Sequence, residues 1–185
     1  MKVQIRHSVF ETNSSSTHAI SIIKKSNITE YPKTVIFNKG EYGWDFDIYV
    51  GTADKASYLW EAIIKYYWQN IDKVKECIRV ITETLAKHGI KAVFVYDDIT
   101  TNTDTYDGRT YTYVICKNAE GNEDDGYLDH PEDLEPFIKS VVFNEQQLLN
   151  YLFDYNSYVS TGNDNSDEEL ECPDFGESWE YEKGN

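Results

Sequence analysis

The chain has few cysteines, and their positions exclude two common uses of this residue. Cys77, Cys116 and Cys172 are odd in number, far apart and never part of a CxxC motif. This excludes a disulfide framework and a cysteine-based zinc site. Because disulfides are rare in reducing compartments, incidental thiols of this kind favour an intracellular protein.

Long apolar segments are also absent. No apolar run approaches the ~18 residues that a membrane-spanning helix requires. The first residues, MKVQIRHSVFETNSSSTH, are polar and contain no apolar h-region, so they do not resemble a signal peptide. These two absences predict a soluble, cytoplasmic protein.

Motifs that bind nucleotides or metal ions are missing. The chain contains no GxGxxG, GxxxxGK[ST], HxxxH or HExxH pattern. The acidic segment NEDDG at 122–126 lacks the ligand spacing of a calcium-binding loop. We therefore expect no cofactor and no resident metal ion.

Basic residues are almost absent from two stretches of the chain, and acids fill both. The segment 119–136 has no lysine or arginine and holds Glu120, Glu123, Asp124, Asp125, Asp129, Glu132, Asp133 and Glu135. The segment 163–185 has one lysine, Lys183, and holds Asp164, Asp167, Glu168, Glu169, Glu171, Asp174, Glu177, Glu180 and Glu182. Since the whole chain carries −16, the remainder is neutral.

This charge layout restricts the partners. A neutral body with two anionic stretches argues against direct nucleic-acid binding and against anionic membranes, since both require positive charge. It favours a partner that presents a basic surface. The aromatic share of 15% is too high for a wholly disordered acidic chain.

The pattern of apolar residues predicts an α+β domain over 1–162, followed by an acidic tail over 163–185. Strands are expected at 2–6, 18–23, 34–38, 45–50, 91–96 and 109–117, with turns at 39–44 and 100–105. The last two strands are expected to pair as a hairpin, because Asp107-Gly108 is a turn signal. The segment 155–161 is expected to be extended.

Helical periodicity marks the middle of the chain and one segment near its end. Leu59, Trp60, Ile63, Ile64 and Tyr67 form one stripe after a capping Thr52 or Asp54, and Val74, Ile78, Ile81 and Leu85 form another after Asn70 or Asp72. Gly89 stands where a helix-ending glycine belongs. Asn144 and Gln147 resemble a capping box before a further helix, and His130-Pro131 suggests a helical turn that Pro136 interrupts.

The most unusual segment of the body is a polar loop between the first two expected strands. Six consecutive hydroxyl or amide side chains at 12–17 separate Arg6 from His18. They could cradle a phosphate or carboxylate, or His18 could act as general base for a serine of 14–16. A tight loop held by Asx and Ser/Thr turns explains the same residues.

Three motifs in the chain carry a resemblance. FETNSSSTHAI at 10–20, YLDH at 127–130 and SYVSTGNDN at 157–165 resemble an uncharacterised family of phage and mobile-element proteins from Gram-positive bacteria. The resemblance covers about an eighth of the chain and implies no catalytic residues. It implies a phage-like origin, hence a place in the cytoplasm of a bacterial host, and favours a counter-defence role.

Two hypotheses follow from these observations. In the first, the chain is an acidic, DNA-mimic-like inhibitor of the anti-CRISPR type, and it occupies the basic groove of a nucleic-acid-binding defence protein such as a CRISPR nuclease. The residues expected to contact that partner are Glu123, Asp124, Asp125, Glu168, Glu169, Glu171 and Trp179. In the second, the chain is a small enzyme or ligand-binding domain, with a polar pocket formed by Arg6, Asn13, Ser14, Ser15, Ser16, His18, Asp129, His130, Asn163 and Asp164.

Overall fold

The structure, a computed structural model, describes residues 16–43, 45–96, 98–118, 120–121, 123, 126–129, 134–163 and 176–183. Its elements are β1 (Ser16–Ile23), β2 (Thr34–Phe37), β3 (Glu41–Tyr42), β4 (Asp47–Tyr49), α1 (Thr52–Tyr66), α2 (Ile71–Lys87), β5 (Lys91–Phe94), β6 (Asp98–Tyr106), β7 (Arg109–Lys117), β8 (Tyr127–Leu128), α3 (Glu135–Val142), α4 (Glu145–Phe153), β9 (Tyr158–Asn163) and β10 (Ser178–Lys183). The α+β class predicted from the sequence is confirmed.

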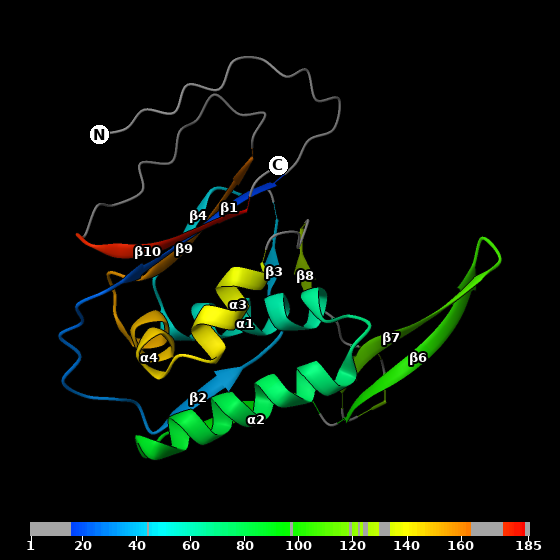
Figure 1. Cartoon of the computed structure of the whole chain (residues 1–185), viewed down its shortest axis with the longest axis horizontal. Coiled ribbons are helices and arrows are strands. Elements are labelled where there is room, and N and C mark those ends of the chain that lie inside the picture. The colour runs from blue at the N-terminus through cyan, green and yellow to red at the C-terminus, as the bar shows by residue number, and fades with distance from the viewer. Residues whose placement is uncertain are drawn as a thin grey trace.

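A four-stranded antiparallel sheet covers one side of a layer of helices (Figure 1). Its order is β10-β1-β9-β4, so β1 lies between two strands from the far end of the sequence. Ile20 and Ile22 of β1 and Val159 of β9 are buried and belong to the main core. The strand β10 falls inside the acidic segment 163–185, so the sheet extends beyond the domain boundary expected at residue 162.

Helix α1 is the centre of the core. Tyr58, Leu59, Trp60, Ala62 and Ile63 are fully buried, which includes most of the stripe predicted from the sequence. The helix begins after Gly51, which provides no side-chain cap, so neither Thr52 nor Asp54 is its capping residue. A helix buried on nearly every side is stabilised by packing more than by its end groups.

Helix α2 lies on the other side of α1 from the four-stranded sheet (Figure 1). The side chain of Asn70 accepts a hydrogen bond from the Lys73 amide, which identifies Asn70 as the N-cap. Gly89 follows the helix with a φ of 72°, as expected of a helix-ending glycine. The chain then enters β5, which pairs in parallel with β2.

Two predictions for this part of the chain are wrong. Residues 100–105 are not a turn but most of strand β6, because threonine, which makes up four of these six residues, favours strands even without an apolar side chain. The segment 109–117 pairs with β6 rather than with 91–96. The turn signal at Asp107-Gly108 is correct, since both residues have positive φ (50° and 70°) as a type I′ hairpin turn requires.

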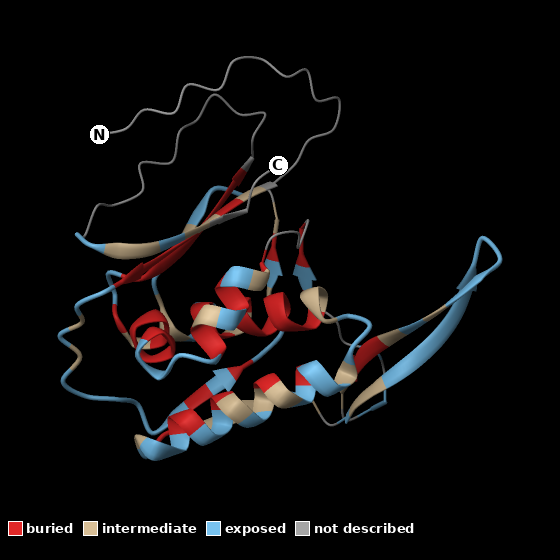
Figure 2. Ribbon diagram, in the orientation of Figure 1, coloured by how far each residue is buried: buried red, intermediate tan, exposed pale blue. Residues whose placement is uncertain are grey.

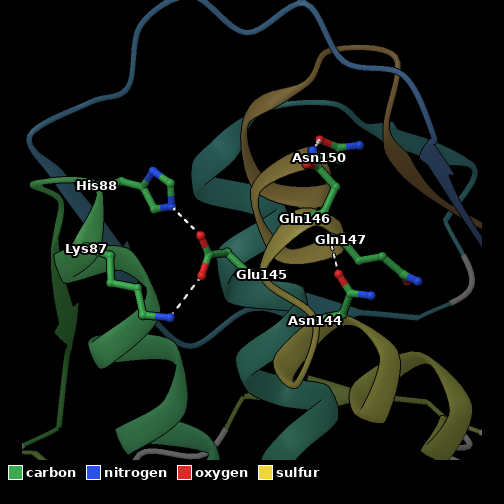
Figure 3. A network of polar contacts seen from close by, with 7 residues as sticks. All are labelled: Lys87, His88, Asn144, Glu145, Gln146, Gln147 and Asn150. Atoms are coloured by element: carbon green, nitrogen blue, oxygen red, sulfur yellow. Dashed lines mark hydrogen bonds and ion pairs between the residues drawn. The ribbon is translucent and has the colours of Figure 1, made fainter.

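Helices α3 and α4 pack beside α1. Pro136 does not interrupt a helix, because it lies in the first turn of α3, where its missing amide hydrogen costs nothing. Asn144 caps α4 by accepting from the Gln147 amide at 3.1 Å, as the capping-box pattern predicts. Glu145 bonds Lys87 at 2.9 Å and His88 at 3.0 Å, which ties the start of α4 to the end of α2 (Figure 3).

The expected turn at 39–44 contains a short strand, β3, which pairs in parallel with β8. Two other expectations, the strand at 2–6 and the helical turn at His130-Pro131, lie outside the described residues. Within the described part of the chain, no helix is long and apolar enough to cross a membrane.

Candidate functional site

The acidic contact residues predicted from the sequence are described only in part. Glu123 is exposed and forms an isolated antiparallel bridge with Lys117. Asp124, Asp125, Glu168, Glu169 and Glu171 lie outside the described residues. Trp179 is half-buried against the core, with the Lys24 Nζ 6.0 Å from its ring centre. This indole therefore packs against the core at the sheet edge, and part of it remains accessible there.

Ion pairs gather on the helical side of the molecule. Lys73 pairs with Glu76 and Arg79 with Glu83 along α2, while Lys139 pairs with Glu135 within α3. Glu145 at the start of α4 contacts both Lys87 and His88. On this side of the protein, positive and negative side chains largely neutralise one another at close range.

The edges of the four-stranded sheet have a different charge distribution. Asp45 and Asp47 lie at the β4 edge, Glu177 and Glu180 lie at the β10 edge, and all four are exposed. Asp47 accepts from the Ile48 amide at 3.0 Å, and Glu180 accepts from the Ser21 and Ser178 hydroxyls. None of the four forms an ion pair with a cation of the described residues. The sheet edges thus carry negative charge that no ion pair with a described cation neutralises. We call these four carboxylates the sheet-edge acids.

Each acidic block includes residues of a described strand. In the second block, Asn163 is the last residue of β9 and Ser178–Lys183 form β10, and these two strands flank β1. The first block contains β8, which pairs with β3 and contacts α1. Both blocks are therefore fixed to the body at described strands.

The sheet also joins two of the three motifs in the sequence. Ser16 pairs with Asn163 and His18 pairs with Thr161 in the β1–β9 register. Of the predicted polar pocket, the backbones of Ser16 and Asn163 and the side chains of His18 and Asp129 are described. Arg6, Asn13, Ser14, Ser15, His130 and Asp164 lie outside the described residues.

A buried histidine–tyrosine cluster lies beneath this junction. His18 is 2% exposed, and its Nδ1 is 2.9 Å from the Tyr58 hydroxyl. The Tyr58 ring makes an edge contact with Tyr42, and burial raises the pKa of both phenols, so they stay neutral. The Asp129 amide donates to the Tyr42 carbonyl at 3.0 Å. The third motif therefore reaches the same cluster through Tyr42.

The Asp129 carboxylate is itself buried and accepts from the Tyr127 hydroxyl at 2.9 Å. This bond raises the pKa of Tyr127, because the neutral phenol is the form that donates. Among the described residues, no group of three histidine, cysteine or carboxylate side chains could hold a metal ion. In addition, burial raises the pKa of the Cys77 thiol to about 12, so this thiol is not poised as a nucleophile.

Two buried charged residues of α1 were not found from the sequence. Lys55 is fully buried, and its Nζ donates to the carbonyls of Asp154 at 2.7 Å and Ser157 at 2.9 Å. Burial lowers the pKa of Lys55 to about 7, although the Asp154 carboxylate acts in the opposite direction. Glu61 is also buried and accepts from the Gly40 amide at 3.2 Å. Both residues organise loops, and neither has a motif that could have identified it.

Comparison of the chain with known protein families, with curated proteins and with solved structures finds no match. The function is therefore argued from the charge distribution and the contacts above.

Proposed function

We propose that this protein binds a basic, nucleic-acid-binding surface of another protein and thereby inhibits it. The observation that carries the proposal is the separation of charge in the described structure. The ion pairs of the described residues lie on or beside the helices, whereas the sheet-edge acids form no ion pair with a described cation. Both acidic blocks are attached to strands, one at β8 and the other between β9 and β10.

Such a surface competes with DNA by simple electrostatics. Duplex DNA presents about one negative charge per 1.7 Å of axis, and proteins bind it with grooves of lysine and arginine. Carboxylates fixed on a folded body offer the same groove an alternative anion without the cost of bending or unwinding a duplex. Complementary charge also speeds the encounter of the two proteins.

The class of partner follows from the phage-like resemblance of the three motifs. A nuclease that defends a bacterium against phage, for example a CRISPR nuclease, has a basic groove and is a target that a phage product would gain from blocking. Inhibition by occupation requires no catalytic residue.

The test is displacement of a labelled DNA duplex from a purified CRISPR nuclease by this chain. We expect the affinity of the chain for the nuclease, obtained from displacement after correction for the weaker DNA binding at high salt, to fall at least tenfold between about 50 and 300 mM salt, since salt screens charges beyond ~8 Å at physiological ionic strength. The variant Asp45→Asn, Asp47→Asn, Glu177→Gln, Glu180→Gln should displace DNA poorly.

A charge-matched control separates this mechanism from net charge alone. Glu76→Gln, Glu83→Gln, Glu135→Gln, Glu145→Gln also removes four carboxylates, but from the paired helical side. Exposed ion pairs of this kind contribute little to stability. Equal loss of displacement in both variants, or displacement that salt does not affect, would show that the sheet-edge acids are not the binding surface.

The joining of the motifs favours a second candidate function, binding of a small anion. Ser16 stands opposite Asn163, and His18 opposite Thr161, at one end of β1. Serine, threonine and asparagine are residue types that suit a phosphate or carboxylate.

Titration with inorganic phosphate, followed by amide NMR, tests this candidate. Shifts confined to residues 16–18 and 161–163 are expected, and Ser16→Ala should weaken them about tenfold, whereas Ser26→Ala, which removes a hydroxyl that donates to Asp154 outside the junction, should not. Spectra that do not change up to 10 mM phosphate would dismiss anion binding and leave the inhibitor proposal unaffected.

A further inference from the structure

The hairpin of β6 and β7 extends from the body as an arm (Figure 1). The arm is exposed except at its base, where Val114, Ile115 and Cys116 of β7 are buried, and Tyr106 near its tip is 78% exposed (Figure 2). The β6–β7 register runs without a break from Asp98–Lys117 to Tyr106–Arg109, so the arm contains no bulge. A two-stranded ribbon is marginally stable in water by itself, and such an arm normally gains stability from further pairing.

The turn determines which backbone groups of β6 are directed away from β7. In a two-residue hairpin the closing pair, here Tyr106 and Arg109, exchanges hydrogen bonds, and bonded and non-bonded pairs then alternate. The outward groups of β6 are therefore those of the odd-numbered residues 99–105. Two contacts agree with this phase, because the amides of Thr103 and Thr105 donate to the side chains of Asn102 and Asp104 instead of to β7.

The two outer edges of the arm are not equivalent. The edge of β7 is already used by the body, since the Val114 amide donates to the Trp68 carbonyl at 2.6 Å and Lys117 bridges Glu123. Within the described part of the chain, β6 pairs with no strand except β7. Edge strands of monomeric proteins are commonly blocked by proline, lysine or a bulge. Strand β6, DITTNTDTY, has none of these.

We propose that two copies of this chain pair through β6 in antiparallel orientation, with Asn102 of one copy opposite Asn102 of the other. The arms then form one four-stranded ribbon in the order β7-β6-β6-β7. The outward backbone groups of Thr101 and Thr103 meet those of Thr103 and Thr101 in the second copy, and Ile99 meets Thr105. About eight hydrogen bonds form in this way, in the phase that the turn imposes.

The placement of the carboxylates is compatible with this register. Asp98 of each copy lies opposite Tyr106 of the other, and Asp104 lies opposite Thr100, so no carboxylate faces a carboxylate. Asp98 also pairs with Lys117 of its own arm. In the single chain, the outward amides of Thr103 and Thr105 donate to the side-chain oxygens of Asn102 and Asp104. On pairing, carbonyls of the second β6 accept from these amides instead.

The arm also reduces repulsion between the bodies. Each chain carries −16, which opposes association. Nine strand residues span about 30 Å, and the antiparallel arrangement separates the two bodies by roughly this length. That distance exceeds the ~8 Å screening length at physiological ionic strength. At low ionic strength the screening length grows to about 30 Å, so added salt is expected to strengthen this dimer up to physiological ionic strength and to have little effect beyond it, whereas salt weakens the binding of a basic partner.

Sedimentation equilibrium of the full chain and of two proline variants tests the proposal. The wild-type chain should reach twice its 21.5 kDa mass as concentration rises. Thr103→Pro should remain monomeric, because it removes an outward donor and adds a ring at the β6 edge. Thr112→Pro is the matched control: it removes the same Thr103–Thr112 hydroxyl contact and an outward amide, but at the β7 edge, so it should still dimerise.

Charge exchange at the dimer centre gives a second, independent measurement. Chains with Thr101→Lys and Thr103→Lys should be monomeric, as should chains with Thr101→Glu and Thr103→Glu, while a mixture of the two should form a mixed dimer. A monomeric wild-type chain at every concentration and salt would overturn the proposal. Dimerisation of Thr103→Pro, or failure of the mixture to associate while wild type dimerises, would equally show that β6 is not the interface.

Discussion

Replacement of Lys55 by methionine is expected to lower the free energy of unfolding by about 2 kcal/mol at pH 7 and by more at pH 9. The buried Nζ is the donor to the carbonyls of Asp154 and Ser157. Methionine fills a similar volume but leaves both carbonyls without this donor, at a cost of about 1–3 kcal/mol for each unsatisfied group. Urea denaturation of both proteins measures the difference.

The pH dependence of that difference follows from the lowered pKa. Lys55 titrates near pH 7 in the fold, whereas an unfolded lysine titrates near 10.4. Between these values the unfolded chain binds more protons, so the stability contributed by Lys55 rises with pH, by at most about 1.4 kcal/mol per unit. Below pH 7 both states are protonated and the contribution stays at its lowest value. The gap between wild type and Lys55→Met should therefore widen from pH 7 to pH 9.

Lys65→Met is the matched control for this experiment. Lys65 belongs to the last turn of the same helix and is only partly buried. Its replacement should change the free energy of unfolding by less than about 0.5 kcal/mol at every pH, as is usual for surface positions. A gap between wild type and Lys55→Met that is constant with pH would mean that Lys55 remains an ammonium group in the folded chain.

Replacement of Gly126 by alanine is expected to cost about 3 kcal/mol, because a β-carbon there has no space. It would lie 2.1 Å from Glu61 Oε1 and 2.4 Å from the Gly40 carbonyl oxygen. Glu61 is buried and bonded to the Gly40 amide, so it cannot move aside without losing that bond. The neighbouring β3–β8 pair should loosen, with faster hydrogen exchange at the amides of Tyr127 and Asp129, which bond to Gly40 and Tyr42.

Gly43→Ala provides the comparison. Its β-carbon would meet the Tyr127 ring at 3.3 Å, and a ring edge can shift by the few tenths of an ångström required. A loss below about 1 kcal/mol is expected there. If Gly126→Ala were as stable as Gly43→Ala, the close packing of residues 40, 61 and 126 would not hold in solution.

Local signals predicted three of the four described helices, but not α3. Asn70 and Asn144 cap the helices that their sequence patterns indicate, and Gly89 ends α2. Each of these features depends on residues within one helical turn. Pairing between distant strands left no such signal, as in the parallel pair of β2 and β5. Strand β6 was missed for a different reason, because polar threonines rather than apolar residues build it.

The candidate sites likewise combine residues that local motifs marked with contacts that only the tertiary structure shows. The three unusual motifs marked His18 and Asp129, but their meeting depends on the β1–β9 register and on Tyr42 and Tyr58, which no local pattern connects. Lys55 and Glu61 lie in a helix whose apolar stripe suggests that charged residues face solvent. The chain buries that helix on nearly every side, and only the tertiary structure shows which carbonyls and amides bond these charges.

The position of β1 has a consequence for synthesis of the protein on the ribosome. Its two neighbours, β9 and β10, lie at 158–163 and 178–183, so β1 has no strand to pair with until more than 130 further residues have been added. At about 5–20 residues per second this delay is on the order of ten seconds. Contacts of such high sequence separation also slow folding, because the chain must close a long loop before the sheet forms. Molecular chaperones that shield exposed strands are therefore expected to bind the nascent chain at Ile20, Ile22 and Ile23 during this interval.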